Sequence, residues 1–301
     1  MKNKFHEDIR AEGMSKIRQN RQRVKSKKTL QLLLLFALLI SGMVFMYFAF
    51  DTFVRLREEQ SARRTSDMIW ELFERPTGNM AGIVQNPTSR PVAGNENDAV
   101  YIDPRFAELA DAFDAVRELT GNDDIVAYIY IAGTTIGYVV LQGENNIAYL
   151  HRDMFGQRNA AGSVFLDYLN SSDFTDPNTI IYGHNMRNQT KFYSLRYYIY
   201  EETGSDFLQA HPYIMIMTAG EVLVYEIFSV FITGVDFYYI QVNFGAGEFE
   251  ELVDELNRRN MHDVGRTATP EDNLLLLSTC SHFNRTERIV VAGRLVQRIG
   301  I

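Results

Sequence analysis

The chain has 301 residues, of which 46% are hydrophobic, and a formal net charge of −8. A chain of this length and composition can form one or two domains with a sizeable core. Its charge is unevenly spread, because residues 1–28 hold ten of the 30 Lys and Arg but only three of the 38 Asp and Glu. The rest of the chain carries a net charge of −15. That excess of acid argues against nucleic acid as a partner, since a phosphate backbone requires a basic protein face.

An apolar run without a formal charge, residues 30–50, directly follows the basic tail. As a helix, these 21 residues are long enough to span a hydrocarbon core. A cleavable signal peptide is the alternative, but its apolar core is usually about 7–15 residues long, and no Ala-x-Ala-like site follows here. The positive-inside rule then predicts a cytoplasmic tail at 1–29, attracted to anionic lipid, and an extracellular remainder.

The segment after the predicted transmembrane helix changes composition twice. Residues 51–74 have a helical pattern, and residues 76–100 hold three prolines among several Gly, Asn and Ser, which is typical of a linker. We therefore predict an extracellular juxtamembrane helix and linker at 51–102, followed by the main domain at 103–301. That domain opens with a predicted helix from Asp103-Pro104 to about Thr120. Its apolar positions are Phe106, Leu109, Phe113, Val116 and Leu119.

Eight short apolar runs separated by turns dominate the main domain, and regularly spaced runs of this kind predict a closed barrel or a sandwich. Two helices are expected to interrupt them, one over 191–202 and an amphipathic one over 248–260. The fold class is therefore mainly β with peripheral helices. The expected strands are residues 126–131, 136–141, 163–166, 179–182, 213–217, 222–232, 274–279 and 289–296.

The only cysteine of the chain, Cys280, stands at the end of one of these predicted strands. A lone cysteine is most often a small buried hydrophobe, and that reading stays open. Without a second cysteine it cannot form an internal disulfide, so an exported domain would carry a free thiol, which hints at reactivity. Two further predicted strands have polar residues at their ends, namely His184 after 179–182 and Arg288 before 289–296.

In the order and spacing of these residues, the chain resembles the class B sortases. The resemblance rests on Tyr-Gly-His-Asn-Met at 182–186, Leu-Ser-Thr-Cys at 277–280 and Arg-Ile-Val-Val at 288–291, in the family's order. Ala-Gly-Ser-Val-Phe-Leu-Asp at 161–167 and Tyr-Ile-Gln at 239–241 also match. The similar region runs from about residue 124 to the C-terminus. It implies a closed barrel of seven to eight strands, preceded by the membrane helix, on the outer face of a Gram-positive cell membrane.

The resemblance also implies an activity, that of a cysteine transpeptidase without metal or cofactor. Cys280 would attack a peptide carbonyl in the C-terminal sorting motif of a secreted protein and form a thioester. His184 would act as general acid and then base, and Arg288 would stabilise the oxyanion. An amine of a peptidoglycan precursor or a pilin would then accept the acyl group. No metal-ligand cluster and no glycine-rich phosphate loop occurs in the sequence.

Each candidate has rivals within the sequence. Arg285 and Arg294 compete with Arg288, and His282 competes with His184 because it lies two residues from Cys280. His151 is expected to be structural. The resemblance also implies a substrate groove lined by five residues. For each of them, the alternative to substrate binding is a role in ordinary packing or in a turn. Those residues are Asn146 and Leu150, opposite Tyr239 and Ile240, with Ser278 near the scissile bond.

Two other functions use the same features. A cysteine peptidase that hydrolyses its thioester would need the same three residues, so only the fate of the acyl group distinguishes it. A non-catalytic anchored binding module is the third possibility. It predicts that Cys280→Ala and His184→Ala leave function intact.

Overall fold

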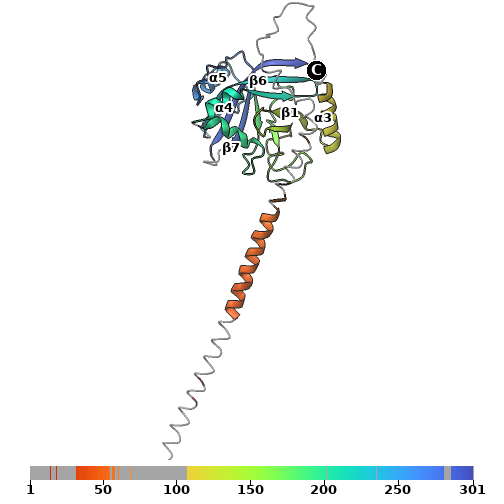
Figure 1. The fold of residues 1–301 in the computed structure, drawn as a ribbon, viewed down its shortest axis with the longest axis vertical. Coiled ribbons are helices and arrows are strands. Elements are labelled where there is room, and N and C mark those ends of the chain that lie inside the picture. Colours follow the sequence, from red (N-terminus) through yellow and green to blue (C-terminus); the bar gives the residue numbers. More distant parts are fainter. Residues whose placement is uncertain are drawn as a thin grey trace, which may run out of the picture. The chain divides into compact units, whose positions relative to one another are not determined.

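The computed structural model describes residues 14, 18, 32–54, 56, 57, 60, 69, 107–200, 202–234, 236–280 and 286–300, with the backbone alone at 107–110 and 280. The chain divides into two units, Met1–Arg57 and Glu58–Ile301. The first holds the apolar helix Leu32–Val54, drawn in orange in Figure 1. Its 23 residues span about 35 Å at helical rise, enough for a hydrocarbon core. The predicted tail and linker lie outside the described residues, apart from single positions.

Eight strands of the second unit close into a barrel in the order β1-β2-β3-β4-β7-β8-β6-β5, which confirms the predicted fold class. The pairs β2–β3 and β4–β7 are parallel, and the other neighbours are antiparallel. The strands are β1 Ile125–Tyr130, β2 Gly137–Leu141, β3 Val164–Leu166, β4 Asn178–Tyr182, β5 Tyr213–Met217, β6 Glu221–Thr233, β7 Leu274–Cys280 and β8 Arg288–Gly300.

The four consecutive leucines of β7 show why its sequence is apolar without alternation. Leu275 and Leu277 point into the barrel interior, where they join the main core cluster. Leu274 and Leu276 belong to a second cluster on the outer face. Because successive side chains of a strand point to opposite faces, a strand covered on both sides needs apolar residues at every position.

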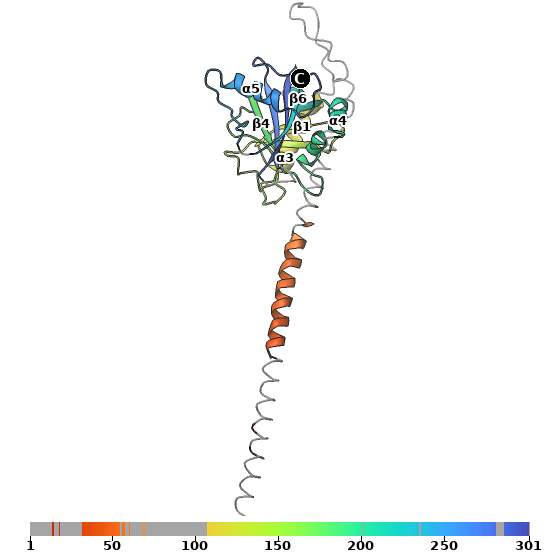
Figure 2. The same ribbon diagram turned by 90° about the vertical axis from the view of Figure 1, so that its left-hand side faces the viewer.

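Helices cover the outer faces and one end of the barrel. They are α3 Ala107–Thr120, the 3-10 helix η2 Phe192–Ile199, α4 Gly204–Ala210 and α5 Glu248–Arg259. Figure 1 shows α3 on the side of the barrel away from α4 and α5, and Figure 2 shows α4 and α5 toward opposite edges of the barrel. α3 packs Phe113 and Val116 on the outer face of β1. α5 packs Leu252 and Leu256 over the outer residues of β7.

Two sequence predictions about helices were wrong in detail. The helix expected over 191–202 is the shorter η2, because its core residues Phe192, Leu195 and Tyr198 recur every three residues, the period of a 3-10 helix. The separate α4 was not predicted. Leu119, expected on the buried face of α3, is 48% exposed.

Candidate active site

Cys280 is the last residue of β7, and His184 follows β4, the parallel neighbour of β7. Tyr182, the last residue of β4, lies beside Ser278 of β7. The Gly183 N–H donates to the Ser278 carbonyl over 3.2 Å. His184 lies two residues after Tyr182, and Cys280 lies two residues after Ser278. The backbones of both candidates therefore reach the same end of the barrel.

Arg288 enters the same region from the third strand. β7 and β8 are antiparallel, and the Cα of Cys280 pairs directly with that of Arg288. The Arg288 guanidinium donates from Nη1 to the carbonyl of Glu287 over 3.0 Å. Three adjacent strands, β4, β7 and β8, therefore bring the three predicted catalytic positions together.

The rival Arg294 lies at the opposite end of β7. It pairs with Leu274, six positions from Cys280, or about 20 Å along a strand. Its Nη2 donates to the Glu226 carboxylate over 2.8 Å. This separation and this ion pair both disfavour Arg294 as the arginine of the site. The other rivals, Arg285 and His282, lie outside the described residues.

One hydrogen bond holds the His184 ring, and another holds its backbone. Its Nε2 lies 2.8 Å from the carbonyl oxygen of Leu150. Because a carbonyl only accepts, Nε2 carries a hydrogen in this geometry, and Nδ1 is the nitrogen that exchanges a proton in the neutral ring. The Phe192 N–H donates to the His184 carbonyl over 2.9 Å and closes the connection that carries the histidine. The ring is therefore oriented before any substrate binds.

Gly162 lets the neighbouring loop approach this ring. Its φ is +54°, and a Cβ there would lie 2.5 Å from the Leu150 carbonyl oxygen and 3.0 Å from His184 Cδ2. Only glycine fits such a close approach without displacing the backbone.

Burial is the largest influence on the pKa of His184, and it lowers that pKa from the ordinary value. The hydrogen bond to Leu150 opposes the shift, whereas positive charge at His151 and at Lys191 adds to it. The His151 ring stacks on His184 with 6.2 Å between centroids. A lowered pKa keeps the His184 imidazole neutral near pH 7.

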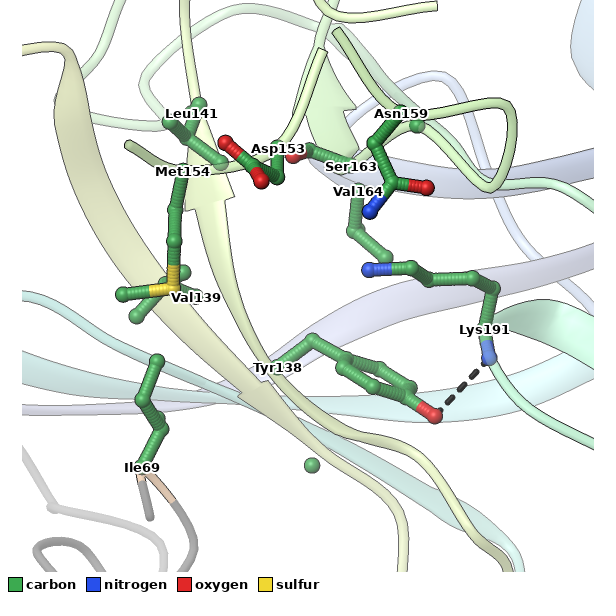
Figure 3. Close-up of a pocket in the computed structure, with 12 residues that line it drawn as sticks. Ile69, Tyr138, Val139, Leu141, Asp153, Met154, Asn159, Ser163, Val164 and Lys191 are labelled. Atoms are coloured by element: carbon green, nitrogen blue, oxygen red, sulfur yellow. Dashed lines mark hydrogen bonds between the residues drawn. The ribbon is translucent and has the colours of Figure 1, made fainter. Parts of the chain in front are cut away.

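Lys191 lines a small cavity together with Asp153 and Asn159 (Figure 3). Its side chain runs between the Tyr138 ring and Asn159, with Nζ 5.1 Å from the ring centroid. Its backbone N–H donates to the Tyr138 hydroxyl over 2.8 Å. The cavity holds about 30 Å³, room for roughly two water molecules and too little for a peptide. Burial lowers the pKa of the Lys191 amine to about 8, and Asp153 opposes that shift.

The predicted groove residues Ser278 and Tyr239 are in contact. The Tyr239 hydroxyl lies 2.7 Å from Ser278 Oγ. Asn178 donates through Nδ2 to the Tyr239 carbonyl over 3.0 Å, which fixes the segment that follows β6. Ile240 is half-buried and packs against the outer cluster beneath α5.

A buried carboxylate links the opposite side of the predicted groove to β4. Asp167 Oδ2 accepts hydrogen bonds from Asn146 Nδ2 and from the Tyr182 hydroxyl, both at 2.8 Å. Asn146 Oδ1 in turn accepts the Tyr168 N–H over 3.0 Å. Leu150 contributes its carbonyl to His184. Leu150 thus contacts the candidate histidine directly, and Asn146 is linked to the end of β4 through Asp167.

Comparison with known proteins identifies the family. The family model of the sortase domain matches residues 129–296. The chain belongs to the sortase family. It is 38% identical over 192 residues to sortase B of Listeria monocytogenes, covering 62% of this chain and 75% of that protein. It is 30% identical over 179 residues to sortase B of Staphylococcus aureus, covering 58% and 72%.

Solved structures agree with class B. A Clostridium perfringens sortase B structure matches with a TM-score of 0.58 and 27% identity, over 64% of this sortase and 90% of that chain. A Staphylococcus aureus sortase B–substrate complex matches with a TM-score of 0.56 and 29% identity, over 62% and 85%. The chain is therefore a class B sortase and a cysteine transpeptidase of that family.

Sequence reasoning missed three residues of this sortase's candidate site. Asp167 closes a motif that the resemblance used, but nothing in the motif indicated its link to Tyr182. Lys191 follows His184 by seven positions, and no spacing rule connects the two. His151 was expected to be structural, yet it is exposed and stacks on the candidate histidine.

The other described histidines lie away from this centre. His262 is 8% exposed, and its Nε2 lies 2.6 Å from the Tyr198 carbonyl oxygen. His211 caps α4 and packs on Phe207 with 4.6 Å between ring centroids. Within the described residues, no group of three or more His, Cys, Asp or Glu is arranged as metal ligands.

Proposed function

We propose that this sortase is a membrane-anchored enzyme that cuts a C-terminal sorting motif of secreted proteins and transfers the acyl group to an amine of the cell wall or a pilin. The proposal rests above all on one observation. The parallel register of β4 and β7 puts His184 and Cys280 at the same barrel end, with Arg288 directly opposite Cys280.

In the first half-reaction, the Cys280 thiolate attacks the scissile carbonyl carbon. A C–S bond forms, and the tetrahedral oxyanion is stabilised by the Arg288 guanidinium, a permanently charged donor. The C–N bond then breaks, and the departing amine takes the proton that neutral His184 accepted from the Cys280 thiol when the thiolate formed. The product is a thioester between Cys280 and the substrate's acyl group.

In the second half-reaction, the acceptor amine attacks the thioester carbon. His184, now neutral, removes a proton from that amine as the new C–N bond forms. The C–S bond breaks and returns the thiolate of Cys280. The low pKa of His184 suits the neutral form that this step requires.

The substrate would lie between the Asn146–Leu150 segment and the Tyr239–Ile240 segment. Ser278 and Tyr239, joined at 2.7 Å, would bind the peptide near the scissile bond. Asp167 would hold Asn146 and Tyr182 in place from behind.

Helix Leu32–Val54 would anchor the enzyme, with residues 1–29 in the cytoplasm and the barrel outside. Its length and apolar composition support a membrane span. The basic residues that precede it support this orientation, because Lys and Arg are retained on the cytoplasmic side.

Intact-mass measurement on the full chain in detergent micelles tests the proposal. The donors are candidate sorting peptides, beginning with the substrate used in the Staphylococcus aureus sortase B complex, and the acceptor is triglycine. We expect an acyl adduct that is absent in Cys280→Ala and that passes to triglycine. Adducts released only as free acid, whatever amine is added, would instead support a peptidase. No adduct with any donor, together with unchanged peptide binding in Cys280→Ala and His184→Ala, would support a non-catalytic module.

A further inference from the structure

A second, larger hollow lies next to the candidate centre, linked to it by His151. It holds about 880 Å³, and its lining includes His151, Arg152 and Arg158. The His151 ring that lines it stacks on His184 with 6.2 Å between centroids. A ligand of a few residues fits in such a volume. The hollow therefore lies next to the histidine, and Ala148 and Tyr149 of the Asn146–Leu150 segment also line it.

A short hairpin over 151–159 builds one wall of this hollow. The Asn159 N–H donates to the His151 carbonyl over 2.9 Å, and the Asp153 N–H to the Gln157 carbonyl over 2.9 Å. Asp153 Oδ1 accepts from two backbone N–H groups of the turn. Ser163 Oγ donates to the Arg152 carbonyl over 2.9 Å, which ties the hairpin to β3. The wall is thus firmly positioned.

The two faces of the hairpin have different surroundings. Asp153 and Asn159 line the small cavity around Lys191 (Figure 3). Arg152 and Arg158 pair directly across the hairpin, are exposed, and line the hollow. Side chains directly opposite in an antiparallel pair lie on one face. Two guanidinium groups therefore leave the hairpin side by side.

Like charges in this position do not stabilise the fold. Directly opposite like charges repel each other, and no ion pair joins Arg152 or Arg158 to an acid within the described part of the chain. Two neighbouring guanidinium groups are, however, well suited to binding a carboxylate. The hollow also contains Glu144, and Asp124, whose carboxylate accepts the Tyr149 hydroxyl over 2.6 Å. It thus offers groups of both charges.

We infer that this hollow binds the acceptor of the second half-reaction, and that the acceptor is a peptide amine that also carries a carboxylate held by Arg152 and Arg158. The inference rests on the proposed function, because it requires an acyl-enzyme for the amine to attack. The amine end would pass His151 toward His184, while the carboxylate stays between the two arginines.

The test compares two acceptors that differ only in terminal charge, triglycine and triglycinamide. The full chain in detergent micelles is loaded with the donor peptide that gives an acyl adduct, and the ratio of transfer to hydrolysis is measured against acceptor concentration. We expect the enzyme to use triglycine at lower concentration than triglycinamide. In Arg152→Gln/Arg158→Gln, we expect the acceptor KM for triglycine to rise about tenfold, with that for triglycinamide almost unchanged.

Two controls distinguish a loss of acceptor binding from misfolding and from a defect in the first half-reaction. Donor hydrolysis without acceptor should keep its rate in the double variant, since the groove and Cys280 are untouched. Arg258→Gln, on the exposed face of α5, should change neither KM. Equal changes for both acceptors, or none, would overturn the acceptor site while leaving the proposed function intact. Failure of every donor to give an adduct with the unaltered enzyme would overturn both.

Discussion

At the scale of single residues, Lys191 is a cation held close to the candidate general acid and base. It lies on the connection closed by the Phe192–His184 backbone hydrogen bond, and its charge lowers the pKa of His184. The pKa of His184 lies below its ordinary value. At the pH at which His184 titrates, the Lys191 amine, whose pKa is about 8, is fully protonated. The whole effect of the lysine charge is therefore present when the histidine changes charge.

Replacing Lys191 by Met should raise the pKa of His184. Loss of a nearby positive charge favours the imidazolium, so the sign of the shift is upward. Lys191→Arg keeps the charge and should leave the His184 pKa low. Titration of the ring by NMR, together with the acidic limb of the kcat/KM profile, measures both variants. An unchanged His184 pKa in Lys191→Met would show that the lysine only fills space.

Asp167 shows why some of the candidate site could not be predicted. It is 3% exposed and ends a quoted motif, so the sequence marks its position but not its partners. The hydrogen bonds to Asn146 and Tyr182 depend on the fold of a loop and on the end of a strand. Local patterns determine where strands and helices lie, whereas contacts of this kind depend on tertiary packing.

At the scale of elements, the apolar runs predicted all eight strands to within a few residues at each end. The runs were informative because both faces of β7 and its neighbours are covered, so burial appears directly as continuous hydrophobicity. Helix type was harder to predict. The apolar residues of η2 fit the three-residue period of a 3-10 helix as well as the period of an α-helix. Short helices such as α4 leave little periodic signal in the sequence.

The register of α3 can be tested with a matched pair. Phe113 is fully buried on the outer face of the barrel, whereas Leu119 is 48% exposed although both were predicted to face the core. Phe113→Ala should lower the free energy of unfolding by about 3–5 kcal/mol, because it leaves a cavity. Leu119→Ala should change it by about 0.5 kcal/mol or less. Urea denaturation of both variants measures the difference, and similar losses would contradict the observed helix register.

At the scale of the whole molecule, the pairing of β4 with β7 was beyond sequence reasoning. It joins Tyr182 to Ser278, residues far apart in the chain, through a parallel register that no local motif encodes. The resemblance supplied the order of His, Cys and Arg, and the barrel supplies the reason that they converge. Because β4, β7 and β8 are neighbours in the closed barrel, the ends that carry these residues lie together. This neighbourhood depends on the complete sheet.

Membrane orientation belongs to this scale too, and the single cysteine makes it measurable. In a Cys280→Ala background, Ser15→Cys reports on the basic tail and Ser172→Cys on an exposed loop of the barrel unit. We expect a membrane-impermeant maleimide added to intact cells to label Ser172→Cys, and to label Ser15→Cys only after permeabilisation. The physical reason is that the basic residues before helix Leu32–Val54 remain on the cytoplasmic side.

Each labelling variant is the control for the other, because both share one background and one reagent. The Cys280→Ala chain without an added cysteine should stay unlabelled and gives the baseline. The reversed pattern, with the tail labelled from outside, would place the barrel in the cytoplasm. Secreted substrates and cell-wall amines would then be out of reach, so that result would count against the proposed function as well as the orientation.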